Sequence, residues 1–205
     1  MDETIVEHLL DAAQQGQDDA VGELLKVYRN YLTILAATQL DRKLRARVSP
    51  SDIVQETMLA AYRDFGKFRG RTEREFLAWL RQILINCWHH AVETHVKAKM
   101  RDVRCEISLD QATEAFDRSA AKIGHLLADP GPSPSGLVGQ RERAVAIADQ
   151  LARLSPQYRD VIVLRNLQGL SFEEIAERLG RNPGATRMLW LRAIEKFKDV
   201  CHPID

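Results

Sequence analysis

Long apolar runs, paired cysteines and a basic N-terminus are missing from this 205-residue sequence. No apolar run approaches the roughly 18 to 20 residues that span a bilayer, and Met1-Asp2-Glu3 is acidic where a secretory signal peptide would be basic. The cysteines (Cys87, Cys105 and Cys201) are odd in number and have no C-x-x-C spacing, which excludes a disulfide framework and a zinc ribbon. We therefore expect a cytoplasmic protein with no membrane segment, no metal and no other cofactor.

The sequence also lacks the alternation of apolar and polar residues that marks a half-buried strand, while apolar residues recur at helical spacing almost throughout. This pattern predicts an all-α fold. Prolines and glycines interrupt any regular helix at 129–136 and predict a Pro/Gly/Ser-containing linker between two small helical domains. The expected helices span 4–15, 18–40, 52–65, 73–99, 141–154, 157–167, 172–179 and 184–200.

The chain is expected to divide into four segments: an N-terminal leader (1–14), a helical domain (15–104), a linker (105–140) and a C-terminal helix-turn-helix domain (141–205). Within the linker, an amphipathic stretch around Phe116 and Ile123 fits either a helix or a segment that becomes ordered on a partner. Helix starts are marked by Ser49-Pro50, by Ser155-Pro156 and by a capping box from Ser171 to Glu174.

The formal net charge is zero, but the charges are unevenly placed. Residues 67–104 carry 9 basic and 4 acidic side chains, whereas 1–66 carry 7 and 11, and 105–140 carry 2 and 5. Such blocks fit either two surfaces with different partners or ordinary solvated helix faces. A further hypothesis is that the acidic linker folds back over the basic block.

Residues 157–199 contain the most specific local pattern. A short helix is followed by a tight turn at 180–183 and then by a second helix, as in a helix-turn-helix. In the second helix, a stripe of apolar residues is expected in the core: Ala185, Leu189, Ala193, Ile194 and Phe197. The opposite face fits a DNA major groove, because apolar side chains can meet thymine methyls while arginines bind guanine or phosphate. The candidate DNA contacts are Arg187, Met188, Leu191 and Arg192 on this face, with Arg181 and Asn182 at the turn. The alternative is that Met188 and Leu191 pack on a neighbouring helix.

The expected helix at 52–65 places Ile53, Leu59, Ala60 and Phe65 inward. Its outward face carries a polar stripe at helical spacing: Asp52, Gln55, Glu56 and Tyr62. The next helix interleaves aromatic and basic residues, a combination that suits single-stranded DNA because unstacked bases stack on aromatic rings. There we expect Trp79 in the core, and we take as DNA candidates Asn86, Trp88, His89, Lys97, Lys99 and Arg101. A basic helix end favoured by the helix dipole is the alternative for the lysines and arginines.

Together the two halves resemble the sigma factors of bacterial RNA polymerase, in the extracytoplasmic-function (ECF) group of the sigma-70 family. The resemblance rests on 52–65 and 75–86, which look like regions 2.2 and 2.3, and on 154–161 and 170–193, which look like regions 4.1 and 4.2. It implies a non-enzymatic factor that binds core RNA polymerase and directs promoter recognition, DNA melting and transcription initiation. An anti-sigma factor is a further partner that the resemblance allows.

The resemblance also implies roles for the candidate residues. The stripe from Asp52 to Tyr62 would bind the clamp helices of the largest polymerase subunit. Asn86 and the residues after it would read the melted minus-10 element, and the face from Arg187 to Arg192 would read the minus-35 element as duplex. The linker matches the segment that the family threads through the polymerase.

Two other functions compete with this interpretation. His89, His90, Glu93 and His95 cluster along one helix and could hold a metal, but no H-E-x-x-H motif and no second ligand-bearing segment accompany them. A stand-alone helix-turn-helix regulator would explain 141–200, but it would leave the patterns at 52–65 and 76–86 without a role.

Overall fold

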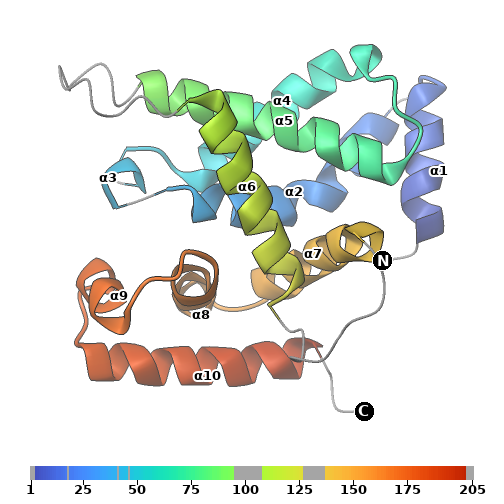
Figure 1. Cartoon of the computed structure of the whole chain (residues 1–205). Helices are drawn as coiled ribbons and strands as arrows, with labels where there is room; N and C mark the ends of the chain where they lie inside the picture. The colour runs from blue at the N-terminus through green and yellow to red at the C-terminus, as the bar shows by residue number, and fades with distance from the viewer. Residues whose placement is uncertain are drawn as a thin grey trace.

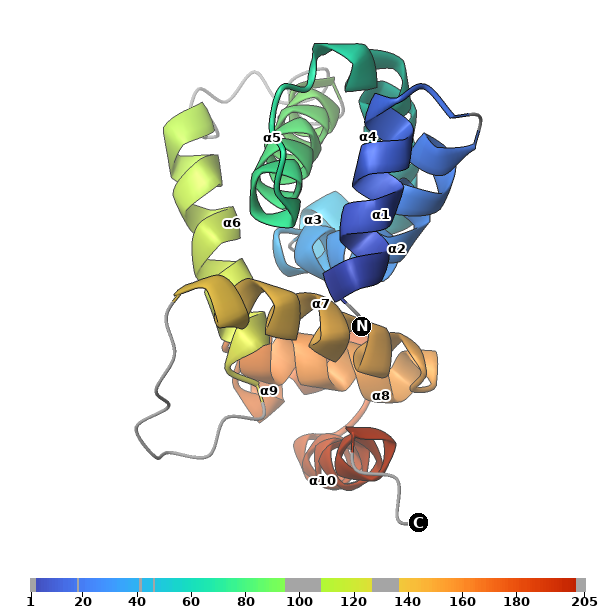
Figure 2. The ribbon, with the colours of Figure 1, turned by 90° about the vertical axis from the view of Figure 1, so that its right-hand side faces the viewer.

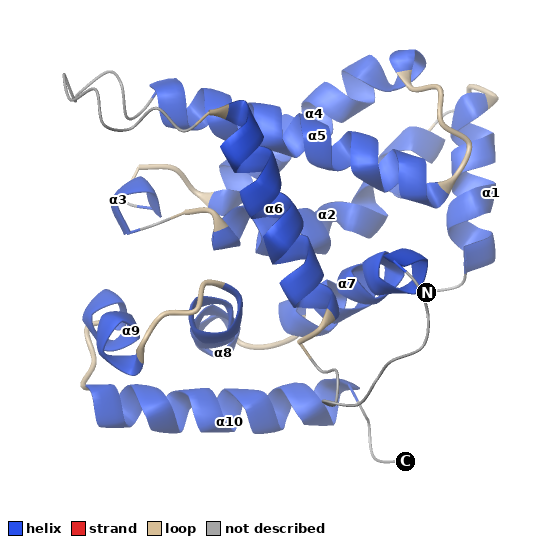
Figure 3. Cartoon of the chain, in the orientation of Figure 1, coloured by secondary structure: helices blue, strands red, loops and turns tan. Residues whose placement is uncertain are grey.

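A computed structural model describes residues 3–17, 19–40, 42–45, 47–94, 108–126 and 137–201. Within these ranges the regular structure is helical, without a strand (Figure 3). The all-α prediction is therefore confirmed. None of the described helices combines the length and the apolar character that crossing a bilayer requires.

The helices form two units, which Figure 1 shows one above the other. The N-terminal unit contains α1 (Glu3–Gln14), α2 (Ala20–Thr38), α3 (Arg42–Arg45), α4 (Pro50–Asp64) and α5 (Glu73–Val92). The C-terminal unit contains α7 (Leu137–Ala152), α8 (Pro156–Ile162), α9 (Phe172–Leu179) and α10 (Pro183–Cys201). Between them in sequence is α6 (Leu109–Gly124). A 3₁₀ turn at Phe65–Lys67 follows α4, and a π-helical turn at Val163–Leu167 follows α8.

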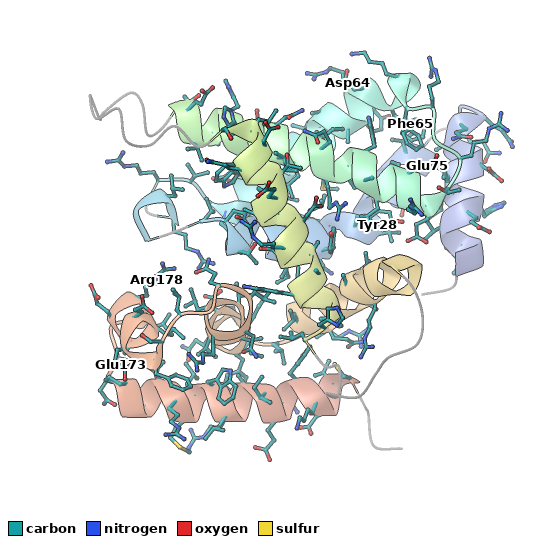
Figure 4. All side chains as sticks on the ribbon, in the orientation of Figure 1. Tyr28, Asp64, Phe65, Glu75, Glu173 and Arg178 are labelled. Atoms are coloured by element: carbon teal, nitrogen blue, oxygen red, sulfur yellow. The ribbon has the colours of Figure 1, made fainter. Side chains whose placement is uncertain are left out.

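An aromatic cluster forms the centre of the N-terminal unit, and Figure 4 labels two of its members, Tyr28 and Phe65. Phe76 is fully buried and lies 5.6 Å from Tyr28, 5.5 Å from Phe68 and 5.7 Å from Trp79 between ring centroids. These tilted and edge-on contacts stabilise the cluster beyond the burial of its area. The cluster holds the turn between α4 and α5 against α5.

Gly70 in that turn has no room for a side chain, because a Cβ there would lie 2.7 Å from the Cβ of Glu75 and in contact with the Phe68 ring. The next residue but one, Thr72, starts α5 with a capping box. Its Oγ1 accepts a hydrogen bond from the Glu75 N–H, and the Glu75 carboxylate accepts one from the Thr72 N–H. The Arg71 N–H, the Thr72 hydroxyl and the Thr72 N–H all donate to the Glu75 carboxylate, and they hold its pKa below its ordinary value.

All three predicted helix starts are confirmed, and two of the three serines cap their helix. Ser49 accepts a hydrogen bond from the Ser51 N–H, and Ser171 forms the expected capping box with Glu174. Ser155 precedes Pro156 but makes no side-chain cap. The proline, whose fixed φ suits the first turn, marks that start without the hydroxyl.

Three segments extend or qualify the helix predictions. The helix expected over 73–99 is α5, which runs to Val92, and residues 95–99 lie outside the described ranges, so its predicted end stays untested. The amphipathic stretch of the linker is a helix, α6, with Phe116 and Ile123 fully buried. Within the predicted leader, α1 packs on α2 and buries Val6 and Leu10. The four-segment division itself stays a prediction.

The two units are in contact, with α7 lying along the boundary between them (Figure 2). Gln168, just after the π-turn, donates its side-chain amide to the carbonyls of Ala37, Thr38 and Leu40 at 3.0, 3.1 and 3.3 Å. Its carbonyl oxygen accepts from Arg178 of α9 at 2.9 Å, and Figure 4 shows Arg178 beside the N-terminal unit. Because the last carbonyls of a helix lack partners within it, Gln168 completes the end of α2 from the other unit.

Candidate partner-binding surfaces

The outer face of α4 is polar at one end and apolar at the other. Asp52, Gln55 and Glu56 are exposed as predicted, and Tyr62 is 58% exposed. The prediction that Leu59 faces inward is wrong, because its side chain is 66% exposed. Leu59 follows Gln55 by four residues and precedes Tyr62 by three, so the spacing that defines this face already includes it.

On the inner side of α4, the buried residue is Thr57, whereas the sequence pattern had predicted Leu59 there. Its hydroxyl donates to the Ile53 carbonyl at 2.7 Å, which satisfies the polar group inside the unit. Next to it, burial raises the pKa of the Cys87 thiol, against a smaller opposing effect of its hydrogen bond with Thr57. A protonated, buried thiol is a packing residue and a poor nucleophile.

The DNA candidates on α5 do not form one surface. Asn86 is exposed and accepts a hydrogen bond from Gln82 at 3.2 Å. His89 lies on the same side, with its Nδ1 3.7 Å from the Glu93 carboxylate. Trp88 lies on the opposite side, since two residues in a helix differ by about 200°.

The expectation of an accessible Trp88 is wrong for this arrangement of the chain. Its side chain is only 3% exposed and packs edge-on against Phe116 of α6, with ring centroids 5.8 Å apart. Trp79 is the more open of the two rings, being half-buried within the aromatic cluster. The other candidates, Lys97, Lys99 and Arg101, lie outside the described residues, as does His95 of the metal alternative. No three His, Cys, Asp or Glu side chains in the described ranges are grouped to hold a metal ion.

The outer face of α10 carries the predicted combination of cations and apolar side chains. Arg187 and Arg192 are exposed, and Met188 and Leu191 are 50% and 45% exposed, so neither packs on a neighbouring helix. The opposite side buries Leu189, Ala193 and Phe197 against the unit. This is the one-sided burial that a recognition helix needs if its free face is to enter a groove.

Ala185 was expected in the core of this helix, but it is exposed, and Thr186 is fully buried in its place. The Thr186 hydroxyl donates to the Asn182 carbonyl at 3.0 Å, so burial leaves no polar group unpaired. The Asn182 side chain accepts a hydrogen bond from the Ala185 N–H at 2.7 Å and so caps α10. Arg181 is exposed and donates to Gln157 at 3.2 Å.

Two further contacts hold α10 against the π-turn and the start of α9. The indole N–H of Trp190 donates to Asn166 at 2.9 Å, and the Trp190 ring lies 5.8 Å from that of Phe172. Gly180, in the turn, has a φ of +63°, a left-handed conformation that glycine adopts at little cost. The turn and the second helix are therefore held rigidly, with their basic and apolar face outward.

Comparison with known proteins agrees with this geometry. A family model described as "Sigma-70 region 2" matches residues 26–97, and one described as "Sigma-70, region 4" matches residues 144–197. The ECF RNA polymerase sigma-E factor of Haemophilus influenzae is 30% identical over 196 residues, 96% of this chain and 95% of that protein. The chain belongs to the sigma-70 family.

Other sigma-70 relatives include the ECF RNA polymerase sigma factor BldN of Streptomyces coelicolor, 30% identical over 91% of this chain and 62% of its own length. The RNA polymerase sigma-H factor of Pseudomonas aeruginosa is 26% identical over 97% of this chain and 94% of its own length. The protein is thus a sigma factor of the ECF group. In this sigma factor, region 2 comprises most of α2 and all of α3, α4 and α5. Region 4 comprises the second half of α7, all of α8 and α9, and most of α10, and α6 belongs to neither region.

Proposed function

We propose that this sigma factor docks on core RNA polymerase through the outer face of α4. The observation that carries the proposal is the combination of exposed Leu59 and Tyr62 with exposed Asp52, Gln55 and Glu56 on one face of a helix within region 2. Exposed apolar and aromatic side chains next to polar ones are typical of protein interfaces. The acidic side chains suit a basic surface on the largest subunit's clamp helices.

The outer face of α10 is the proposed reader of duplex minus-35 DNA. Arg187 and Arg192 supply hydrogen-bond donors for guanine or phosphate, and Met188 and Leu191 supply apolar contacts for thymine methyls. Arg181, at the turn before α10, is placed to bind a phosphate. Asn182 contributes by capping α10, since its side-chain oxygen is already bonded there.

For the melted minus-10 strand, the proposed contacts begin at Asn86 and His89 on one side of α5 and continue into Lys97, Lys99 and Arg101. The basic block of 67–104 favours this assignment, because cations hold the backbone of single strands. Because the two DNA-binding regions are on one chain, the second contact is effectively intramolecular once the first has formed. An anti-sigma factor stays a candidate partner.

The decisive experiment is in vitro transcription with purified bacterial core polymerase on a genomic DNA library. We expect the wild-type chain to produce start sites that share two upstream elements. Absence of any start site above that of core polymerase alone would contradict the proposed function. Tight binding to one duplex site without polymerase would instead favour a stand-alone regulator.

The docking face is tested separately by a pull-down with core polymerase. Replacing both Gln55→Ala and Glu56→Ala should lower the retained fraction without changing helix content. The matched control is Glu7→Ala with Gln15→Ala, the same pair of side-chain types, exposed on α1 and in the turn that follows it. Equal retention of the two double variants would remove the α4 assignment.

A further inference from the structure

A cavity that opens to solvent lies where α6 meets the end of α2, the π-turn and α9. Figures 1 and 2 both show the C-terminal end of α6 reaching the C-terminal unit. The cavity has a volume of about 320 Å³, which is at the lower end of the range for small-ligand sites. None of the residues that line it belongs to the polymerase and DNA faces described above.

The lining of this cavity is positively charged. Three of its side chains are cationic, namely Arg118 and Lys122 of α6 and Arg178 of α9, and no aspartate or glutamate is among the described residues that line it. Outside the lining, the Glu114 carboxylate lies 3.4 Å from Arg118. Both of these side chains are largely exposed, so that pair is weak. The walls of the cavity therefore do not neutralise its charge.

The hydrogen bonds within the lining hold the cationic groups in place and use only part of their donors. Lys122 donates to the Leu167 carbonyl at 3.0 Å, and an ammonium group has three donors. Arg178 donates to the side-chain oxygen of Gln168 at 2.9 Å, and a guanidinium group has five. The Ser119 hydroxyl accepts one hydrogen bond and can donate another. Several donors can thus meet the oxygens of one anion.

A fourth cation lies close to Arg178. Arg45 of α3 donates to the Ala37 carbonyl at 3.2 Å, and its Nε is buried with no hydrogen-bond partner among the described residues. Burial lowers the pKa of the Arg45 guanidinium, Asp160 opposes this effect, and Arg178 adds to it. Arg178 thus has a like-charged neighbour, and an anion beside the two guanidinium groups would reduce their repulsion.

We propose that this cavity binds a small molecule that carries a phosphomonoester group, with Arg118, Lys122 and Arg178 holding the phosphate. Three cations without an acidic neighbour in the lining match a dianion better than the single charge of a carboxylate. Guanidinium groups also bind phosphate oxygens in pairs. The organic part of the ligand lies against Ala115 and Leu170, which are apolar members of the lining. This inference goes beyond the proposed function and does not rest on it.

The depth of the cavity favours a free small molecule over a phosphate of a DNA backbone. Ser119 in the lining is only 7% exposed, so the cavity extends below the surface of the chain. A duplex is stiff and carries its phosphates on the outside of a wide rod, so it cannot follow the lining inward. The two sources of phosphate can therefore be separated by experiment.

The test is isothermal titration calorimetry of the full-length chain with phenyl phosphate and with inorganic phosphate at constant ionic strength. The measurement is made at about pH 8, where a phosphomonoester carries two charges. We expect one saturable site that binds phenyl phosphate about threefold or more tightly than inorganic phosphate, because the ring adds apolar contact. Replacing both Arg118→Gln and Lys122→Gln should weaken the binding of phenyl phosphate about tenfold or more, because two charged donors are lost. Both side chains are exposed, so circular dichroism should show unchanged helix content.

The matched control is Arg192→Gln with Lys196→Gln. These are the same two residue types at the same spacing on α10, and both are exposed. In each pair, one cation also has an acidic partner on its own helix. The control should bind phenyl phosphate within about twofold of the wild type, because its exposed cations lie outside the cavity.

Absence of saturable binding to the wild type would overturn the proposal, and so would equal weakening in the two double variants. Weakening in the control alone would assign the phosphate to the outer face of α10. A short duplex of arbitrary sequence should leave phenyl phosphate bound to the control variant, and displacement there would mean that the cavity takes DNA phosphates instead. All of these titrations are made without polymerase, so their failure leaves the proposed function standing.

Discussion

The two helices that carry the DNA candidates are enclosed to different degrees. The helix α10 is held from one side, by α7, α8 and α9, and its outer face is exposed. By contrast, α5 is contacted by α1, α2, α4 and α6, from both the N-terminal unit and the linker. A helix at the edge of a unit keeps a broad exposed face, whereas a central helix keeps only a narrow one. This is why α10 presents four neighbouring candidates and α5 presents only Asn86 and its neighbours.

The cores of the two units differ in the residues that fill them. The N-terminal unit has an aromatic cluster that includes Phe65, Phe68, Phe76 and Trp79 around the start of α5. The C-terminal unit is mostly aliphatic inside, and its main buried ring is Phe197. The N-terminal unit thus depends on a few large rings, and the C-terminal unit on many smaller contacts.

The largest expected effect is that of Phe76→Ala, which should lower the free energy of unfolding by about 3 to 5 kcal/mol. Phe76 is fully buried and its ring meets Tyr28, Phe65, Phe68 and Trp79, so truncation leaves a cavity and removes ring contacts. Denaturant unfolding followed by circular dichroism measures the change.

The control for core truncation is Tyr62→Ala, at a ring that is 58% exposed, which should cost less than about 0.5 kcal/mol. Phe197→Ala makes the same truncation at a fully buried ring of the C-terminal unit. If Phe197→Ala destabilised the chain more than Phe76→Ala, the contrast between an aromatic and an aliphatic core would be wrong.

The second prediction concerns the free face of α10. Arg187→Ala should weaken transcription by roughly 1 to 3 kcal/mol at promoters that carry the matching upstream base, because a bidentate base contact is lost. Transcription assays on paired promoters that differ at single upstream positions measure the loss. Lys198→Ala, an exposed cation near the far end of the same helix, is the control. A loss of equal size on every promoter would show that Arg187 binds phosphate and does not read a base.

The exposed face of α10 could be predicted from the sequence because its burial is one-sided. Met188 and Leu191 lie off the stripe of Leu189, Ala193 and Phe197, and the structure exposes them as that spacing implies. The same reasoning predicted the all-α fold and two of the three serine caps. Local patterns are sufficient where only one side of an element is covered.

Two errors had one physical cause. Leu59 and Ala185 were expected inside, but Thr57 and Thr186 are buried instead. In each case the threonine hydroxyl donates to the carbonyl four residues earlier, so it behaves as a buried methyl-bearing side chain with no unpaired polar group. A hydrophobicity pattern that counts threonine as polar therefore places the buried stripe of a helix one or two residues away from its true position.

Trp88 could not be placed from the sequence, because its burial depends on a helix that lies outside the domain. Phe116 covers it from α6, 28 positions along the chain, across residues that contain no pattern linking the two segments. The contact between the units at Gln168 cannot be predicted from the sequence either, because it joins a side chain to backbone carbonyls near residue 38. Long-range packing of this kind is where sequence periodicity stops being informative.

A smaller effect is expected at the helix caps, one in each unit. Thr72→Ala and Ser171→Ala should each lower the free energy of unfolding by about 1 kcal/mol, because each removes the acceptor for an N–H in the first turn. Ser155→Ala is the control, as Ser155 precedes a helix without making a side-chain cap. A cost at Ser155 equal to that at Ser171 would mean that the hydroxyl acts in some way other than capping. Unequal costs at Thr72 and Ser171 would show that the units differ in stability at their edges as well as in their cores.

The smallest expected effect is a pH dependence confined to the N-terminal unit. Hydrogen bonds from Arg63 and Lys67 lower the pKa of Asp64 from 3.8 to about 2. Because the folded-state pKa lies below the unfolded value, the contribution of this group is complete above about pH 4 and is lost as the pH falls through about 2. In acid unfolding followed by circular dichroism, the wild type should lose stability over this window slightly more steeply than Asp64→Asn, which cannot titrate. The lysine and arginine are largely exposed, so salt should reduce the difference. Identical acid profiles in low salt would mean that these surface pairs do not contribute to the stability of the turn between α4 and α5.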